Sequence, residues 1–243
     1  MQIVILAGGY GTRLHSIVSD RPKSMALINK KPFLEYQITF LKNQGFSDFV
    51  ICAGYKHEKI IEYFKDGKDH SVLINYSIEK EPLGTGGAIK AALDLLEEQF
   101  IVINGDTLTN LQYDSLIHFH NMKITNVTMV LAKVKNNSRY GSVVTDTNDM
   151  VISFSEKITN SVSSFVNAGI YLFNKNSVNW QMFTPHFSLE NDLFPVLVSQ
   201  KTMFGFKFNG YFVDIGVPEE FIQFEKNVPS LDWLYKKDFN MHS

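Results

Sequence analysis

The sequence predicts an α/β fold of three layers, in which helices cover both faces of a mixed central sheet. Strand and helix patterns alternate between residues 2 and 105, and this alternation is typical of a parallel sheet. After about residue 125 strand patterns dominate, which indicates a mixed-sheet second half folded onto the first. A glycine-rich turn, ILAGGYGTRL, follows the first strand. Together these observations favour a Rossmann-like α/β/α arrangement.

Each element of the first half has its own signal. The run QIVILA at 2–7 is short, apolar and followed by glycines, as a buried parallel strand would be. Residues 32–44 place apolar side chains on one helix face, and Gly45 follows as a stop signal. Similar patterns predict, in order, a strand at 48–54, a helix at 57–67, a strand at 71–79, a helix at 86–98 and a strand at 100–105.

The second half is richer in strands. Strand patterns occupy residues 126–134, 142–146, 150–156 and 164–173. A helix at 188–200, a strand pair formed by 203–208 and 210–216, and a helix near 218–227 complete the chain. No linker-like tract divides it, so we expect one domain over 1–243 with two halves, at about 1–110 and at about 111–243. No hexapeptide repeat occurs, so no β-helix extension is expected.

Composition narrows the function classes. The formal net charge is −2 and the sequence pI is about 6.4, which argues against a surface built for nucleic acid. The single cysteine, Cys52, lies in an apolar run and excludes an internal disulfide. No apolar stretch approaches the ~20 residues of a membrane span, and the N-terminus lacks the features of a signal peptide. We therefore expect a cytoplasmic protein with no nucleic-acid or membrane partner.

The glycine-rich turn fits neither of two familiar phosphate-binding patterns. Leu14 stands where a dinucleotide-binding turn has its third glycine, and no glycine precedes Lys23-Ser24 as a triphosphate-binding P-loop requires. The turn nevertheless offers backbone N–H groups, followed by Arg13 and Lys23. These donors suit a triphosphate that loses pyrophosphate. The alternative is a tight turn with two solvated cations.

Two aspartates end apolar runs just beside glycines. Asp106 lies in NGDT and Asp214 in FVDIG, and strand ends of this kind meet where open α/β sheets bind ligands. Two carboxylates brought together can hold Mg²⁺ with phosphate oxygens and water. The alternative is that each is a turn former or helix cap. The seven histidines are scattered and form no metal-binding pattern, and Cys52 is interpreted as a core residue.

The motifs LAGGYGTRL and PKSM resemble the signature of the sugar-1-phosphate nucleotidylyltransferases, in which L-A-G-G-x-G-T-R-L precedes P-K-P. Ser24 replaces the second proline. Further similar segments, EPLGTGGAI, NGDT, FSEK, NAGIY and FVDIG, follow in order along nearly the whole chain. The family usually has threonine after D-x-G, whereas this chain has Val217, which puts the role of that hydroxyl in doubt. SLEND and the run from TRLHS to PFLEY are most similar to the guanylyltransferases that act on D-glycero-D-manno-heptose 1-phosphate.

The resemblance implies that the half at about 1–110 binds the nucleotide and that the half at about 111–243 binds the sugar phosphate. It also implies site residues. It implies catalytic roles for Arg13, Lys23, Asp106 and Lys157, and metal binding by Asp106 and Asp214. Nucleotide-binding positions are Leu6, Ala7, Gly8, Gly9, Gly11, Thr12, Arg13, Lys23, Glu81, Pro82, Gly84, Thr85, Gly105 and Asp106, with Glu81 near the base edge. Sugar-phosphate-binding positions are Gly141, Glu156, Lys157, Asn167, Gly169 and Glu190. For Glu190, a helix-capping carboxylate is nearly as good an interpretation.

The resemblance also implies a reaction. A nucleotidyl group passes from a nucleoside triphosphate, expected to be GTP, to a sugar 1-phosphate, expected to be the heptose, with Mg²⁺ as cofactor and pyrophosphate as the second product. The alternatives are a mannose-1-phosphate guanylyltransferase, a uridylyl- or cytidylyltransferase for another sugar, and a catalytically silent regulatory homologue. Polysaccharide precursor synthesis is the expected setting, and a homodimer is an expectation from the family alone. The sequence leaves open the base, the sugar, its anomer and any feedback regulation.

Overall fold

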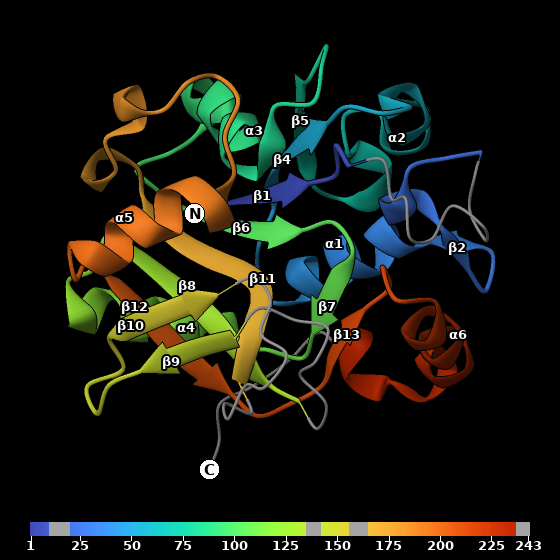
Figure 1. The fold of residues 1–243 in the computed structure, drawn as a ribbon. Coiled ribbons are helices and arrows are strands. Elements are labelled where there is room, and N and C mark those ends of the chain that lie inside the picture. The colour runs from blue at the N-terminus through green and yellow to red at the C-terminus, as the bar shows by residue number, and fades with distance from the viewer. Residues whose placement is uncertain (10–19, 135–141, 156–164, 237–243) are drawn as a thin grey trace. The chain divides into compact units, whose positions relative to one another are not determined.

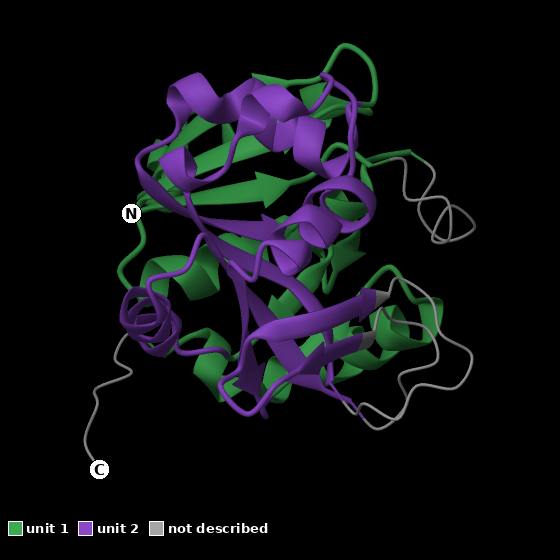
Figure 2. Ribbon diagram, turned by 60° about the vertical axis from the view of Figure 1, so that its left-hand side comes forward, with its two compact units in different colours: residues 1–82, 104–110, 211–243 green, residues 83–103, 111–210 purple. Residues whose placement is uncertain are grey.

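A computed structural model describes residues 1–9, 20–134, 142–155 and 165–236. The chain divides into two compact units, which Figure 2 distinguishes by colour. Unit 1 comprises residues 1–82, 104–110 and 211–243, and unit 2 comprises residues 83–103 and 111–210. The expectation of one domain with two consecutive halves stays a prediction.

A parallel sheet forms the centre of unit 1 (Figure 1). Its strands are β1 (Gln2–Leu6), β4 (Asp48–Ala53) and β5 (Leu73–Ile78), and β4 pairs with both neighbours. Residues 3–5 and 49–53 are fully buried, which explains why the two strands β1 and β4 are apolar without alternation. The helices α1 (Phe33–Asn43) and α2 (His57–Phe64) join these strands.

Several short elements also belong to unit 1. β7 (Thr107–Thr109) pairs antiparallel with β13 (Phe212–Asp214), and β2 (Leu27–Ile28) pairs antiparallel with β3 (Lys31–Pro32). α6 (Pro218–Asn227) follows β13. The 3-10 turns are η2 (Lys23–Met25), η3 (Lys68–His70), η8 (Val228–Ser230) and η9 (Asp232–Leu234).

Unit 2 is built around strands of mixed direction. β11 (Phe165–Asn174) pairs antiparallel with β6 (Gln99–Asn104), β8 (Val127–Lys133) and β9 (Ser142–Thr145). β10 (Val151–Ser155) pairs antiparallel with β9, whereas β12 (Met203–Phe208) pairs in parallel with β8. The mixed sheet predicted from the strand-rich second half is confirmed.

The described residues of unit 2 form three helices. They are α3 (Gly84–Ala92), α4 (Tyr113–Lys123) and α5 (Phe194–Ser199), and a π-helical turn, η7 (Leu189–Leu193), leads into α5. The 3-10 turns are η4 (Leu93–Leu95), η5 (Lys175–Ser177) and η6 (Trp180–Met182). Among the described residues, no helix is both long and apolar enough to span a bilayer. The cytoplasmic location stays a prediction.

The structure confirms most of the predicted elements but corrects two points. The strands at 203–208 and 210–216 exist, but they do not form a pair, because β12 pairs with β8 and β13 pairs with β7. The helix α4 is missing from the prediction. Its buried face includes the polar His120, while Met122 and Ile124 at its end are exposed, so the apolar periodicity is weak.

Candidate active site

The first turn of the site lies at the end of β1 in unit 1. Ala7 is buried and donates its backbone N–H to the carbonyl oxygen of Cys52 at 2.8 Å, which continues the pairing with β4. Leu6 and Gly8 are half-buried, and Gly9 is exposed. A Cβ atom added at Gly9 would have no atom of the described residues within 4 Å. The remaining predicted positions of this turn, Gly11, Thr12 and Arg13, lie outside the described residues.

Three charged side chains of unit 1 converge on Gly216. Lys23 forms an ion pair with Asp106, and both side chains are 21% exposed. A Cβ atom added at Gly216 would lie 2.7 Å from the Lys23 ammonium, 2.8 Å from a carboxylate oxygen of Asp214 and 3.3 Å from one of Asp106. We call Lys23, Asp106, Asp214 and Gly216 the carboxylate–lysine cluster. Glycine at 216 leaves the space in which the three charged groups meet.

Backbone pairing sets the positions of the two aspartates. The β7–β13 register places Asp214 opposite Thr107, next to Asp106. The carbonyl oxygen of Asp106 accepts the N–H of Ile215 at 2.9 Å, and the N–H of Gly216 donates to the Asp214 carboxylate at 2.7 Å. The predicted convergence of these two strand ends is therefore present in the structure.

A buried amide fixes the loop that carries Asp106. The Gln37 side chain, on α1, donates to the carbonyl oxygens of Asn104 at 2.9 Å and Thr107 at 2.6 Å. Within the same loop the N–H of Gly105 donates to the carbonyl oxygen of Leu6 at 2.9 Å. The loop that carries Asp106 is thus held by hydrogen bonds to α1 and to the end of β1.

The donor set of the carboxylate–lysine cluster fits a magnesium ion. Mg²⁺ prefers oxygen ligands and is commonly bound by one or two carboxylates together with substrate phosphates and water. Asp106 and Asp214 supply two such carboxylates near one point, and the Lys23 ammonium shows that this point attracts a cation. No group of three or more His, Cys, Asp or Glu side chains suited to a metal occurs in the described part of the chain. Because Mg²⁺ commonly takes one or two carboxylates and completes its shell with water and phosphate oxygens, the two aspartates of the cluster suit a metal that also binds a substrate.

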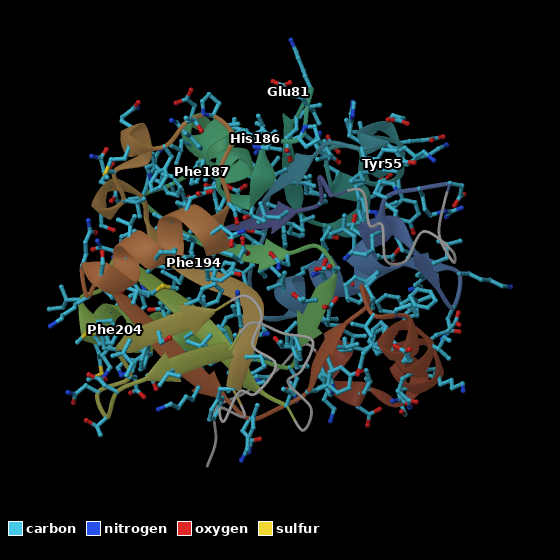
Figure 3. All side chains as sticks on the ribbon, viewed as in Figure 1. Tyr55, Glu81, His186, Phe187, Phe194 and Phe204 are labelled. Carbon is cyan, nitrogen blue, oxygen red and sulfur yellow. The ribbon has the colours of Figure 1, made fainter. Side chains whose placement is uncertain are left out.

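The loop after β5 carries two further predicted positions. Glu81 and Pro82 are both exposed, and Figure 3 shows Glu81 toward the outer end of this loop. The neighbouring positions of unit 2 begin α3, where Gly84 is exposed with φ +75° and Thr85 is half-buried. Their predicted role in nucleotide binding stays a prediction.

A hydrogen-bonded network in unit 2 joins three of the predicted side chains. Thr85 donates its hydroxyl to Glu190 at 2.7 Å, and Tyr171 donates to the same carboxylate at 3.5 Å. Asn167 donates its amide N–H to the Tyr171 hydroxyl at 2.8 Å and accepts the N–H of Gly169 at 2.9 Å. Gly169 has φ +69°, a conformation that glycine adopts most easily. We call these residues the Glu190 network.

The helix-capping alternative for Glu190 is not what the structure shows. Ser188 caps η7, since its hydroxyl accepts the backbone N–H of Glu190 at 3.1 Å and of Asn191 at 3.2 Å. The carboxylate that accepts the backbone N–H of Ser188, at 2.7 Å, belongs to Asp192. The Glu190 carboxylate instead accepts from the hydroxyls of Ser188 and Thr85.

Three residues of these clusters are not among the positions that the motifs imply. Tyr171 belongs to NAGIY and lies four residues from Asn167 on one strand. Ser188 begins SLEND. Gly216 belongs to FVDIG, and its role depends on two aspartates that are distant in the chain. Alternation along a strand was the available signal for Tyr171, and no local signal indicates the role of Gly216.

Three predicted sugar-phosphate positions lie outside the described residues, namely Gly141, Glu156 and Lys157. Val217 is described. It is buried at the N-cap position of α6, and its apolar side chain makes no capping hydrogen bond to the helix.

Known proteins resemble the chain along most of its length. A D-glycero-alpha-D-manno-heptose 1-phosphate guanylyltransferase of Aneurinibacillus thermoaerophilus is 41% identical over 229 residues, covering 94% of this chain and 98% of that protein. A mannose-1-phosphate guanyltransferase of Saccharomyces cerevisiae is 35% identical over 228 residues, covering 91% of this chain and 63% of that protein.

A solved structure shows the same fold. The crystal structure of HddC from Yersinia pseudotuberculosis matches with a TM-score of 0.84 and 35% identity, covering 93% of this chain and 99% of that one. The structure of HddC complexed with GMP-PN matches with a TM-score of 0.82. These matches confirm the resemblance found in the sequence and the fold that it implies. Since the model of the family named Nucleotidyl transferase matches residues 2–230, the chain belongs to the nucleotidyl transferase family.

Proposed function

We propose that this enzyme transfers GMP from GTP to D-glycero-D-manno-heptose 1-phosphate, and releases the GDP-sugar and pyrophosphate. The observation that carries the proposal is the meeting of Lys23, Asp106 and Asp214 around Gly216. One ammonium and two carboxylates at a strand end suit a reaction in which negative charge moves between phosphate groups.

The chemistry is an in-line displacement at phosphorus. An oxygen of the sugar phosphate attacks the α-phosphorus of GTP, and the bond from that phosphorus to the oxygen bridging it to the β-phosphorus breaks. The electron pair leaves with pyrophosphate. The attacking oxygen is already anionic at neutral pH, so no general base is required, and positioning and electrostatics carry the reaction.

Residues of the carboxylate–lysine cluster have distinct roles in this proposal. Asp106 and Asp214 hold Mg²⁺, which when bound neutralises charge on the phosphate oxygens. Lys23 separates from Asp106 and stabilises charge on the transferring phosphoryl group and on the departing pyrophosphate. Arg13 stabilises the same negative charge, and Lys157 positions the sugar phosphate. Both roles rest on the sequence motifs alone.

The Glu190 network is suited to sugar hydroxyls. Carboxylate and amide groups that are already oriented by neighbours, as those of Glu190 and Asn167 are, lose little entropy when they bind a polyol. The heptose and GTP assignments draw on the similarity to the Aneurinibacillus guanylyltransferase and to HddC complexed with GMP-PN. The similarity to the yeast mannose-1-phosphate guanyltransferase makes mannose 1-phosphate the second candidate. The homodimer and cytoplasmic location remain predictions.

A substrate matrix tests the proposal. Pyrophosphate release is measured with Mg²⁺ for each of four nucleoside triphosphates against hexose and heptose 1-phosphates. We expect the highest kcat/KM with GTP and the heptose 1-phosphate. A preference for UTP or CTP, or for mannose 1-phosphate, would replace the substrate assignment by the corresponding alternative. No release with any pair would favour the silent homologue.

The variant Asp106→Asn adds a test of the metal ligands. It keeps the shape of the side chain and removes its charge, so we expect kcat to fall by about 100-fold or more. The matched variant Asp192→Asn changes an exposed carboxylate that accepts the backbone N–H of Ser188 at the start of η7. We expect its kcat to stay within about twofold of the wild type, because the change is made at the surface. A wild-type kcat in Asp106→Asn would show that this aspartate is not a metal ligand.

A further inference from the structure

Gln37 is a polar residue on the apolar face of α1. Residues three and four positions apart share one face of a helix. At this spacing from Gln37 lie four buried apolar side chains, namely Phe33, Leu34, Phe40 and Leu41. Gln37 is as buried as they are, with 1% of its surface exposed. Because burying an amide costs free energy that an apolar side chain would not cost, packing alone does not explain a glutamine at this position.

The amide of Gln37 bridges the turn in which Asp106 lies. Its Nε2 atom donates to the carbonyl oxygens of Asn104, at 2.9 Å, and of Thr107, at 2.6 Å, which stand on either side of Gly105 and Asp106 in the sequence. A glutamine amide has two N–H donors, so these two bonds use both. Within the described part of the chain, the buried Oε1 atom of Gln37 has no hydrogen-bond partner. The amide therefore acts here as a pair of donors to one turn.

Two further backbone hydrogen bonds hold the same turn without Gln37. The N–H of Gly105 donates to the carbonyl oxygen of Leu6 at 2.9 Å, and the N–H of Ile215 donates to the carbonyl oxygen of Asp106 at 2.9 Å. All of these residues belong to unit 1. Loss of the Gln37 amide would therefore let the turn shift without releasing it from β1 or from the segment after β13. We expect the protein to keep its fold and the Asp106 carboxylate to change position.

A small shift of this carboxylate matters to the metal assigned to it. Mg²⁺ demands a near-ideal octahedral shell with ligands at about 2 Å, so it tolerates displaced ligands poorly. We propose that Gln37 is a positioning residue for the metal site, and that its two hydrogen bonds hold Asp106 where it can share one cation with Asp214. Gln37 itself contacts neither the metal nor the substrate. This inference rests on the proposed function, which assigns Mg²⁺ to the two aspartates.

Metal binding without nucleotide tests the inference apart from the reaction. Mn²⁺ replaces Mg²⁺ as a paramagnetic probe, and its dissociation constant is measured by electron paramagnetic resonance for the wild type, Gln37→Met, Asp106→Asn and the control Gln2→Met. Gln2 begins β1 and is also a buried glutamine of unit 1, whose Nε2 donates to the Asp48 carboxylate at 3.1 Å. We expect Gln37→Met to bind Mn²⁺ at least about tenfold more weakly, and Gln2→Met to stay within about twofold of the wild type.

Kinetics give a second measurement that a merely structural role would not change. A lower folded fraction reduces the maximal rate and the amount of bound metal, but it leaves the metal concentration at the midpoint unchanged. In Gln37→Met we expect the Mg²⁺ concentration for half-maximal rate to rise by about tenfold, with the KM for the sugar phosphate within about threefold of the wild type. If Gln37→Met does not fold, Gln37→Asn replaces it, since it keeps an amide that is one methylene too short to bridge the turn.

The outcomes separate the inference from the proposed function. Mn²⁺ affinity in the Gln37 variant equal to that of the wild type would overturn the inference and leave the proposed function standing. An equal loss of affinity in Gln2→Met would also overturn it, because any buried glutamine would then have the same effect. So would a wild type whose Mn²⁺ affinity does not depend on Asp106. A wild type that shows the expected metal binding but turns over no substrate pair would overturn the proposed function alone.

Discussion

Gly216 shows how a residue without a side chain determines the chemistry of its neighbours. The position where its Cβ would lie is within 3.3 Å of an ammonium and two carboxylates. Any larger residue would compete with these groups for the same space. The atoms nearest to that position are the ends of flexible side chains, so the protein can accommodate a methyl group by moving them.

We therefore expect Gly216→Ala to lower activity much more than stability. Displacing Lys23 or Asp214 by part of an ångström is expected to reduce kcat by about tenfold or more. The free energy of unfolding should change by less than about 1 kcal/mol, since flexible groups give way. Steady-state kinetics and urea unfolding measure the two effects. A variant with wild-type kcat would show that the arrangement around Gly216 does not matter to the reaction.

At the scale of single elements, the helix α4 shows why an element can be missing from a prediction based on sequence. Its inward side carries His120, which is 1% exposed and hydrogen-bonds through Nδ1 to the Thr128 hydroxyl of β8 at 2.8 Å. Apolar periodicity does not predict a helix that buries a histidine, because histidine counts as a polar residue. The hydrogen bond that makes this burial possible joins residues that only the folded chain brings together.

Burial of His120 has a consequence for stability. Burial lowers the pKa of its imidazole below the ordinary value of 6.5, although a hydrogen bond with Asn174 opposes this shift. Below pH 6.5 the unfolded chain binds a proton at this residue more readily than the folded chain does. The contribution to stability is therefore complete above pH 6.5 and is lost as the pH falls toward the lower pKa of the folded state.

We expect the free energy of unfolding of the wild type to fall between pH 7 and pH 5.5 by more than that of His120→Gln. Urea unfolding at the two pH values measures the difference. The control is His118→Gln on the same helix, where the side chain is exposed and the fall should match that of the wild type. Equal pH dependence in all three proteins would show that His120 titrates alike in both states.

At the scale of elements, the long strands and amphipathic helices were predictable because their periods are visible over six or more residues. This applies to β4 and α1, whose patterns match the structure within a residue or two. The three-residue strands β7 and β13 are too short for a period, and their pairing fixes the positions of Asp106 and Asp214. The motifs identify the residues of the site, but they do not predict how these residues are arranged in space.

At the scale of the whole molecule, the order of motifs along the chain was the most informative signal. Lys23, Asp106 and Asp214 lie in three distant segments, yet all belong to unit 1 and meet at one point. Thr85, Asn167 and Glu190, also distant in sequence, join within unit 2. Sequence resemblance identified these residues, whereas their contacts with one another required the folded chain.

In the proposed reaction, the bond that breaks in GTP joins the α-phosphorus to the oxygen that bridges it to the β-phosphorus. The most direct measurement follows GTP labelled at the α-phosphate, with D-glycero-D-manno-heptose 1-phosphate and Mg²⁺, and identifies the labelled product by chromatography and mass spectrometry. We predict that the label appears in the GDP-sugar, in a one-to-one ratio with pyrophosphate. Label that remains in GDP while inorganic phosphate is released, or that appears in free GMP, would contradict nucleotidyl transfer to the sugar phosphate.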